Sequence, residues 1–126
     1  MELHHIAISV NDLRESIGFY EKHFGFTLDR MYEKPSGPRF CFLTGKAVRL
    51  ELFEFKDRER PKDSQTDMRI LGIRHIAFKV DDIKRKTEQL QKEGLQFDGI
   101  KDGTSCKYYT FTTDPNGVSI ELFEAN

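Results

Sequence analysis

The stretch HIAISV at residues 5–10 returns as HIAFKV at residues 75–80, and ELFE at residues 51–54 returns at residues 121–124. Both repeats are separated by 70 positions, so the register holds at both ends of one unit. Two copies are too few for a solenoid, which needs at least three stacked repeats to bury its core. We therefore predict two fused copies of one unit that share a core.

The first segment of each unit is predicted to be a strand with one apolar face. In residues 5–10, Ile6, Ile8 and Val10 alternate with His5 and small side chains. This period of two is typical of a half-buried strand. The stretch at residues 75–80 repeats the alternation, so the same kind of strand is expected to open the second unit.

A helix follows each of these strands. Asp12 begins a capping-box spacing, apolar residues then recur at helical intervals, and Gly25 can end the helix. In the second unit, Asp81 or Asp82 can cap a helix that ends by Gly94.

Three further strands complete each unit. The turn signals PSGP at residues 35–38 and DPNG at residues 114–117 each separate two strands. The second strand of each unit is expected around residues 28–33 and around residues 95–100.

The sequence thus predicts an α+β fold of two tandem βαβββ modules. Their strands would form a curled mixed sheet, a half-barrel cup, with the helices outside. Module 1 covers residues 1–55 and module 2 covers residues 72–126, within one domain of residues 1–126. The charged segment at residues 56–71 contains Pro61 and is predicted to be a linker.

The repeated polar side chains on the strands point to a metal site. His5, Glu51, His75 and Glu121 all fall on the strand faces away from the helices, so they would line the cup. Imidazole and carboxylate together suit borderline divalent metals such as Zn, Ni, Co, Fe or Mn. Carboxylates buried without partners are costly, which favours a bound cation. The alternative is that the motif repeats by descent and serves folding alone.

Composition excludes several function classes. The formal charge of −1 offers no field for nucleic acid or an anionic membrane. No apolar run approaches the roughly 20 residues of a membrane helix, and no signal peptide is visible at the N-terminus. Two cysteines are too few for a disulfide framework. We therefore expect a cytoplasmic protein with reduced thiols and a small-molecule partner.

Four motifs in this order resemble the glyoxalase, bleomycin resistance and extradiol dioxygenase superfamily, also named vicinal oxygen chelate. They are LHHIAISVNDLRESIGFYEKHFGF (3–26), RLELFEF (49–55), RHIAFKVDDI (74–83) and TDPNGVSIELFE (113–124). The chain is most similar to short bacterial proteins related to glyoxalase I, lactoylglutathione lyase. The resemblance implies paired modules, usually a homodimer, and one divalent metal in a cup built either within one chain or across two.

The resemblance also assigns the ligands. In glyoxalase I the metal-binding set is His, Glu, His, Glu, which His5, Glu51, His75 and Glu121 match in this sequence. Bleomycin-binding relatives lack this set, and epimerases for methylmalonyl-CoA usually carry Gln where Glu51 stands. Ring-cleaving dioxygenases and fosfomycin-modifying relatives use two His and one Glu.

Two positions depart from glyoxalase I. Ser9 stands where the bacterial enzymes have an Arg that contacts glutathione, and Phe55 stands where they have an Asn. Another thiol cofactor or another substrate therefore remains open.

Other side chains on the same predicted faces are candidates for substrate binding. Arg49 and Lys79 could bind an anionic group, and the aromatic residues Phe53, Phe55 and Phe123 could supply an apolar wall. His4 is expected to be exposed and to point away from His5.

The leading functional hypothesis is a metal-dependent lyase or isomerase acting on a small oxygen-chelating substrate, for example a thiol adduct of a 2-oxoaldehyde. Glu121 or Glu51 would move a proton between adjacent carbons, with Glu121 preferred by analogy. The alternatives are a dioxygenase or thiol transferase on the same scaffold, and a binding protein without turnover.

Overall fold

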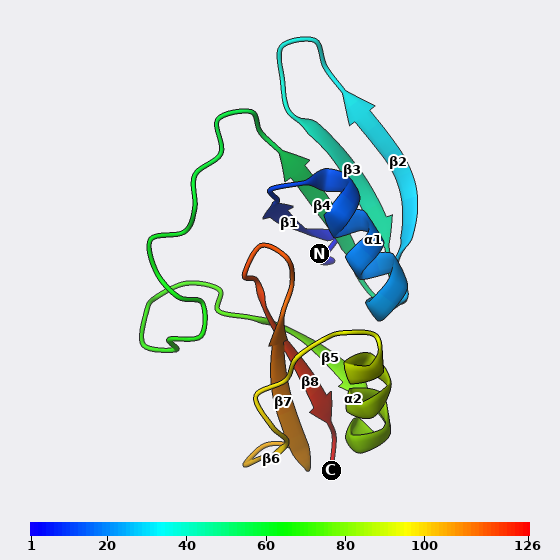
Figure 1. Cartoon of the computed structure of the whole chain (residues 1–126), viewed down its shortest axis with the longest axis vertical. Coiled ribbons are helices and arrows are strands. Elements are labelled where there is room, and N and C mark those ends of the chain that lie inside the picture. The colour runs from blue at the N-terminus through cyan, green and yellow to red at the C-terminus, as the bar shows by residue number, and fades with distance from the viewer. The chain divides into compact units, whose positions relative to one another are not determined.

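A computed structural model describes residues 1–126, which form two compact units, Met1–Arg60 and Pro61–Asn126. In unit 1 one helix accompanies a mixed four-stranded sheet of order β1-β4-β3-β2 (Figure 1). Strands β1 and β4 run parallel, and the other neighbours are antiparallel. The elements are β1 (His5–Ser9), α1 (Leu13–Phe24), β2 (Thr27–Glu33), β3 (Arg39–Thr44) and β4 (Arg49–Glu54).

Unit 2 repeats this topology, with sheet order β5-β8-β7-β6 and β5 parallel to β8. Both units are open sheets, and together they confirm the predicted pair of βαβββ modules. The elements are β5 (Ile76–Val80), α2 (Ile83–Lys92), β6 (Lys101–Asp102), β7 (Tyr108–Thr113) and β8 (Ser119–Glu124).

The structure has no strand at residues 95–100, where one was expected. The strand β6 begins only at Lys101 and has two residues. Asp98 takes over the contacts of this segment with β7. Its backbone N–H donates to the carbonyl of Phe111, and its carboxylate accepts from the Phe111 N–H at 2.9 Å and from Thr110. One backbone hydrogen bond and two side-chain hydrogen bonds of Asp98 therefore join this segment to β7 where a strand was expected.

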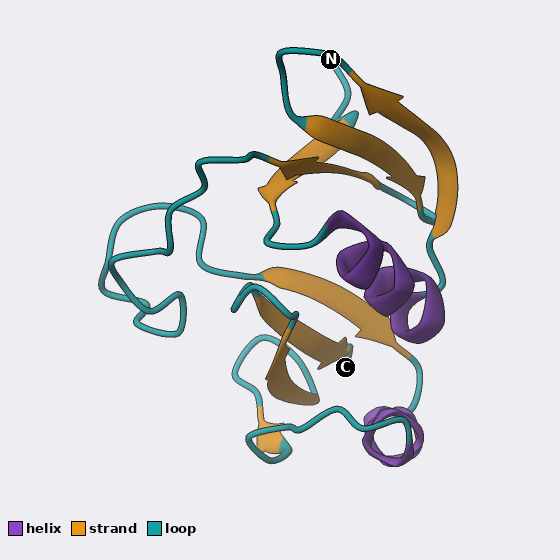
Figure 2. Cartoon of the chain, turned by 45° about the horizontal axis from the view of Figure 1, so that its top comes forward, coloured by secondary structure: helices purple, strands orange, loops and turns teal.

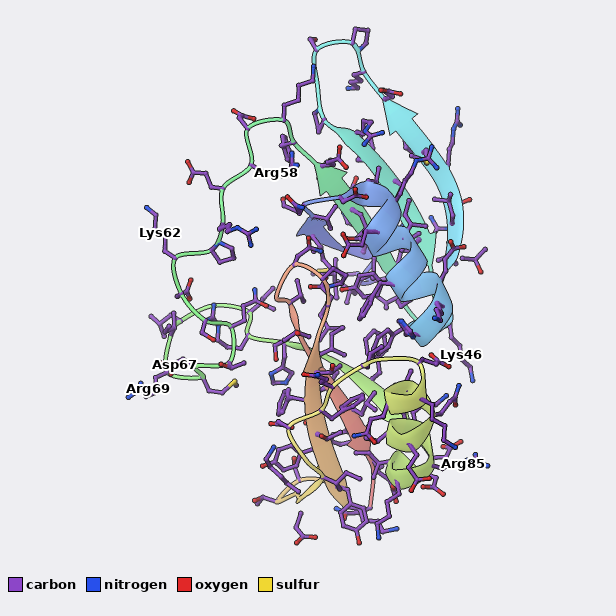
Figure 3. The ribbon with its side chains drawn as sticks, in the orientation of Figure 1. Lys46, Arg58, Lys62, Asp67, Arg69 and Arg85 are labelled. Carbon is purple, nitrogen blue, oxygen red and sulfur yellow. The ribbon has the colours of Figure 1, made fainter.

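The connection between β4 and β5 contains neither helix nor strand (Figure 2). Lys62, Asp67 and Arg69 point away from its ribbon (Figure 3), and Arg69 pairs with Asp67 at 2.9 Å. The charged composition thus matches a solvated segment. Neither α1 nor α2 has the length and apolar content that crossing a bilayer requires.

Helix α1 begins and ends where the sequence predicts. The Asp12 side chain accepts the Glu15 N–H at 2.9 Å, and Gly25 stops the helix at φ 70°. The helix buries Leu13 and Tyr20. Helix α2 begins in the same way at Asp82.

The sheet of unit 1 buries one face almost completely. Its four inward side chains have no exposed surface, and they are Cys41, Leu43, Leu50 and Leu52. Burial raises the pKa of the Cys41 thiol to about 11, so this cysteine remains a neutral core residue. The alternate positions of β3 and β4 are only half-buried, which leaves the opposite face of the sheet for other roles.

A glutamate at the end of the last strand ties each sheet to its helix. In unit 1 the Glu54 Oε2 accepts the Leu13 N–H at 2.7 Å, while its Oε1 pairs with Arg39 at 2.6 Å. In unit 2 Glu124 accepts the Ile83 N–H at 2.8 Å and pairs with Lys107.

These contacts satisfy donors that a helix N-terminus otherwise leaves open, and they place negative charge where the helix dipole favours it. The hydrogen bond from Arg39, followed by that from the Leu13 N–H, lowers the pKa of Glu54. The hydrogen bond from Lys107, followed by that from the Ile83 N–H, lowers the pKa of Glu124. The second Glu of ELFE is therefore explained by folding.

The hydrogen bonds of Glu54 to Arg39 and to the Leu13 N–H, which we call the Glu54 clamp, predict that the stability of the fold depends on pH in acid. Because the pKa of folded Glu54 lies below its ordinary 4.5, its stabilisation is present above pH 4.5 and is lost as the pH falls through the lowered pKa. We expect Glu54→Gln to lower the unfolding free energy at pH 7 by about 1 to 2 kcal/mol and to flatten its decline in acid. Urea unfolding between pH 3 and pH 7 measures both. The exposed Glu59→Gln serves as control, and equal acid dependence in all three proteins would contradict the clamp.

Two glycines near α1 predict opposite effects of the same substitution. A Cβ at Gly18, inside the helix, or at Gly25, with φ 70°, meets no atom within 4 Å. Gly18→Ala should therefore raise the free energy of unfolding by about 0.5 to 1 kcal/mol through helix propensity. Gly25→Ala should lower it by about 1 kcal/mol through the left-handed backbone. Thermal unfolding measures both, and a loss at Gly18 would show that its exposed face has an unseen contact.

Candidate functional site

The parallel pairing of β1 and β4 brings His5 and Glu51 together in unit 1. The strands place Ala7 directly opposite Glu51, so His5 reaches the carboxylate diagonally. The distance from His5 Nε2 to Glu51 Oε2 is 3.2 Å, and the side chains are 37% and 16% exposed. Both belong to the sheet face opposite the buried leucines, as the alternation predicts.

Unit 2 contains the same pair. His75, just before β5, lies with its Nε2 3.0 Å from Oε2 of Glu121 on β8. The side chains are 26% and 13% exposed. The His75 Nδ1 is buried and has no hydrogen-bond partner. The repeat in the sequence is therefore also a repeat of side-chain geometry.

An aromatic ring supports each histidine, and the sequence analysis missed both rings. Phe42 lies opposite Glu51 in the β3–β4 register, and Phe111 lies opposite Glu121. Phe42 meets the His5 ring edge-on at 5.5 Å, and Phe111 meets that of His75 at 5.2 Å. The two phenylalanines are 69 positions apart instead of 70. A search at the spacing of 70 therefore aligns Phe42 with Thr112.

His4 is exposed, as expected, but the expectation that it points away from His5 is wrong. The two Nδ1 atoms lie 2.9 Å apart, and the ring planes are almost perpendicular. His4 precedes the first residue of β1, so the alternation of the strand does not decide its direction. Both nitrogens of the His5 ring therefore have a neighbour.

The donors present fit a divalent metal by their chemistry. Each unit offers one imidazole nitrogen and one carboxylate oxygen close together, a combination that suits borderline divalent ions. No group of three or more His, Cys, Asp or Glu side chains that could hold a metal occurs within either unit. Each unit thus contains one His and one Glu of the four predicted ligands.

The predicted substrate-binding residues have different surroundings. Arg49 is half-buried in β4 and Lys79 is exposed in β5, and neither forms an ion pair with the site glutamates. Phe123 pairs with Tyr109 and Lys79 in the sheet of unit 2. The two cations are therefore available to an anionic group on a ligand.

Phe53 and Phe55 belong to a row of stacked rings across the sheet of unit 1. Tyr32 stacks on Phe40 at 4.8 Å, Phe40 on Phe53 at 5.1 Å, and Phe53 on Phe55 at 5.9 Å. Arg30 covers the outer ring of Tyr32. Phe55 is 40% exposed at the other end of the row. Unit 1 thus has an extended aromatic surface on the face that carries His5 and Glu51.

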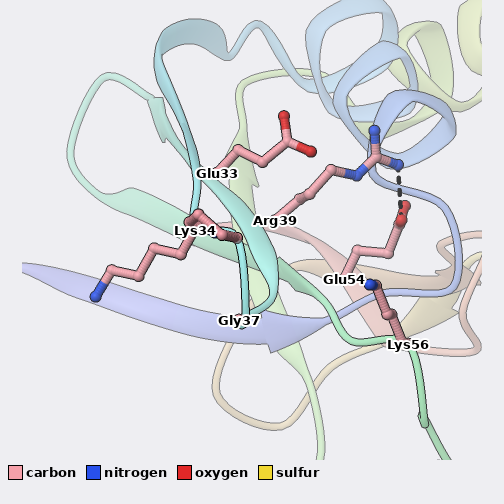
Figure 4. Close-up of a pocket in the computed structure, with 7 residues that line it drawn as sticks. Glu33, Lys34, Gly37, Arg39, Glu54 and Lys56 are labelled. Atoms are coloured by element: carbon pink, nitrogen blue, oxygen red, sulfur yellow. Dashed lines mark hydrogen bonds and ion pairs between the residues drawn. The ribbon is translucent and has the colours of Figure 1, made fainter.

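A cavity of about 620 Å³ in unit 1 does not belong to this site (Figure 4). It lies beside the Arg39–Glu54 pair, whose glutamate reaches the first turn of α1, and none of the predicted site residues lines it. Figure 4 shows the Lys34 side chain directed away from that pair. The lining residues are Glu33, Lys34, Pro35, Gly37, Arg39, Glu54 and Lys56.

Comparison with known proteins finds relatives along the whole chain. The Escherichia coli protein YaeR, which is uncharacterised, is 36% identical over 98% of this chain and 95% of its own. A lactoylglutathione lyase of Shigella flexneri is 31% identical over 98% of this chain and 93% of its own. The crystal structure of a glyoxalase family protein from Enterococcus faecalis superposes with a TM-score of 0.82. It is 27% identical and covers 98% of this chain and 97% of its own.

The family model of the Glyoxalase/Bleomycin resistance protein/Dioxygenase superfamily matches residues 2–122. This range contains the first βαβββ module, the second module up to Leu122 in β8, and both His–Glu pairs. The chain therefore belongs to the glyoxalase, bleomycin resistance protein and dioxygenase superfamily.

Proposed function

We propose that the protein is a divalent-metal-dependent lyase or isomerase acting on a small substrate with two neighbouring oxygens. The observation that carries this proposal is the repeated His–Glu pair, with nitrogen–oxygen distances of 3.2 and 3.0 Å. Each pair offers an imidazole nitrogen and a carboxylate oxygen side by side, the donor types that borderline divalent metals take. Membership of the superfamily and the lactoylglutathione lyase relative support the reaction class.

The metal is proposed to be held by His5, Glu51, His75 and Glu121 together. Bound there, a divalent ion supplies a Lewis acid that polarises a substrate oxygen. The chain's own contribution is to orient the donors. Phe42 and Phe111 hold the imidazoles edge-on, and the glutamates stay close to the Nε2 atoms.

Glu121 is proposed as the group that moves the proton. A carboxylate that takes a proton from one carbon can return it to the next, which is what isomerisation of adjacent carbons requires. Glu121 is 13% exposed and lies between His75 and Phe111, so the proton it holds is shielded from bulk water. Glu51 stands in the equivalent position of unit 1 and is the second candidate.

The proposed substrate is apolar around its reacting oxygens. In unit 1 the row of stacked rings supplies a wall, with Phe55 exposed at its end. Ser9 is small and uncharged, so it offers no cation to a carboxylate of glutathione at the position where bacterial glyoxalase I has an Arg. We therefore propose a thiol adduct of a 2-oxoaldehyde in which the thiol is less polar than glutathione, with Arg49 or Lys79 contacting an anionic group.

Metal analysis tests the site itself. Purified wild-type protein should carry about one divalent ion per chain. The double variant Glu51→Gln, His75→Ala should lose it, because it deletes one imidazole donor and also replaces one anionic oxygen donor with a neutral, weaker one. His23→Ala, which changes a histidine outside the site, should keep the ion. If the wild type holds no ion after reconstitution with Zn, Ni, Co, Mn and Fe, the enzymatic proposal is wrong.

Turnover of methylglyoxal adducts with glutathione and with less polar thiols tests the reaction. Glu121→Gln should retain the metal and lose turnover by at least about 100-fold, the usual scale of general-base catalysis. Full turnover with metal bound would rule out Glu121 as the proton carrier and direct attention to Glu51. Oxygen uptake with catechols would instead indicate a dioxygenase, and a ligand released unchanged would indicate a binding protein.

A further inference from the structure

His4 and His5 form a pair of imidazoles that has no counterpart in unit 2. Their Nδ1 atoms lie 2.9 Å apart, while the other ring nitrogen of His5 lies 3.2 Å from Glu51. Phe42 packs edge-on against both rings, at 6.3 Å from His4 and 5.5 Å from His5. The exposed His4 ring therefore has two ring neighbours, His5 and Phe42.

At position 74, which corresponds to His4 in the repeat, the chain has Arg74. Its guanidinium donates to Asp63 at 3.1 Å and to the Ile73 carbonyl. The Nδ1 of His75 is buried and has no hydrogen-bond partner. The second ring nitrogen is thus satisfied only in unit 1, so the contact to His4 is not something the repeated fold requires.

The chemistry of the contact depends on tautomers. A neutral imidazole carries one N–H, and which nitrogen holds it depends on its neighbours. While the His5 Nε2–H donates to Glu51, the His5 Nδ1 can only accept, and His4 donates to it. When the His5 Nε2 offers its lone pair to a metal, the proton must be on Nδ1, and His4 must accept.

An imidazole can make this exchange, whereas a carbonyl or carboxylate can only accept. Exchange with water completes the proton balance of this change of tautomers. The His5 Nε2 proton leaves to solvent and the His4 Nδ1 proton passes to the His5 Nδ1. The exposed His4 ring then takes one proton from solvent at its own Nε2. Both rings begin and end neutral, and no net proton is released.

We propose that His4 is a positioning residue that satisfies the His5 Nδ1 in both tautomers and so prepares the His5 Nε2 to bind a divalent metal. This inference rests on the proposed function, because it concerns the same metal site. Partners of this kind orient ligating histidines, and their removal typically weakens metal binding by about 10- to 100-fold.

Calorimetric titration with Zn and Ni tests the inference with three variants. His4→Ala should bind each metal at least about tenfold more weakly, with unchanged stoichiometry and an unchanged melting temperature. His4→Asn should recover most of the affinity, because its amide oxygen accepts from the Nδ1–H of the metal-bound form. Arg74→Ala changes the corresponding residue of unit 2 and should leave the affinity within about twofold, because the Arg74 guanidinium donates to Asp63 and to the Ile73 carbonyl and not to the His75 ring.

Two further measurements distinguish a failure of the positioning role of His4 from a failure of the proposed metal site. X-ray absorption should count the same number of imidazole ligands in wild type and His4→Ala, and a lost imidazole would show that His4 is itself a ligand. In the metal-free protein, the ¹⁵N shift of the His5 Nδ1 should change in His4→Ala and stay constant in Arg74→Ala. If the wild type binds no metal, the proposed function fails, and this shift still decides the pairing. Wild-type affinity in His4→Ala would overturn the positioning role while leaving the metal site intact.

Discussion

The parallel pairing of the first and last strands is the constraint on which each unit depends. It joins segments that are about 45 residues apart in the chain and makes β1 the neighbour of β4, and β5 the neighbour of β8. Two consequences follow from this single pairing. The His at the start of one strand reaches the Glu in the middle of the other, and the Glu at the strand end reaches the first turn of the helix.

The motif ELFE therefore contains two glutamates with separate tasks. Glu51 and Glu121 lie on the face that carries the histidines. Glu54 and Glu124 lie on the helix side, and each accepts a hydrogen bond from a backbone N–H of its helix and from a cationic side chain. Their hydrogen bonds lower the pKa of the two clamp glutamates. One motif thus serves both folding and the proposed chemistry, which explains why it recurs as a whole and not as a single residue.

The two units are alike in topology and different in detail. Unit 1 has the stacked rings from Tyr32 to Phe55 and the His4–His5 contact. In unit 2 the strand β6 is short, Lys101 covers Tyr109, and the His75 Nδ1 has no partner. The two His–Glu pairs therefore stand in different surroundings, although the strands that carry them repeat.

The sequence by itself determined the repeat, the two helices with their caps and the face that His5 and Glu51 share, because periodicity and capping are local properties. It did not place β6, since residues 95–100 are joined to β7 by backbone and side-chain hydrogen bonds of Asp98 without forming a strand. It did not find Phe42 and Phe111, because their equivalence follows from strand register and not from sequence spacing. Only the tertiary structure decided the direction of His4. That residue precedes the strand, so no alternation governs it, and its place follows from packing against His5 and Phe42.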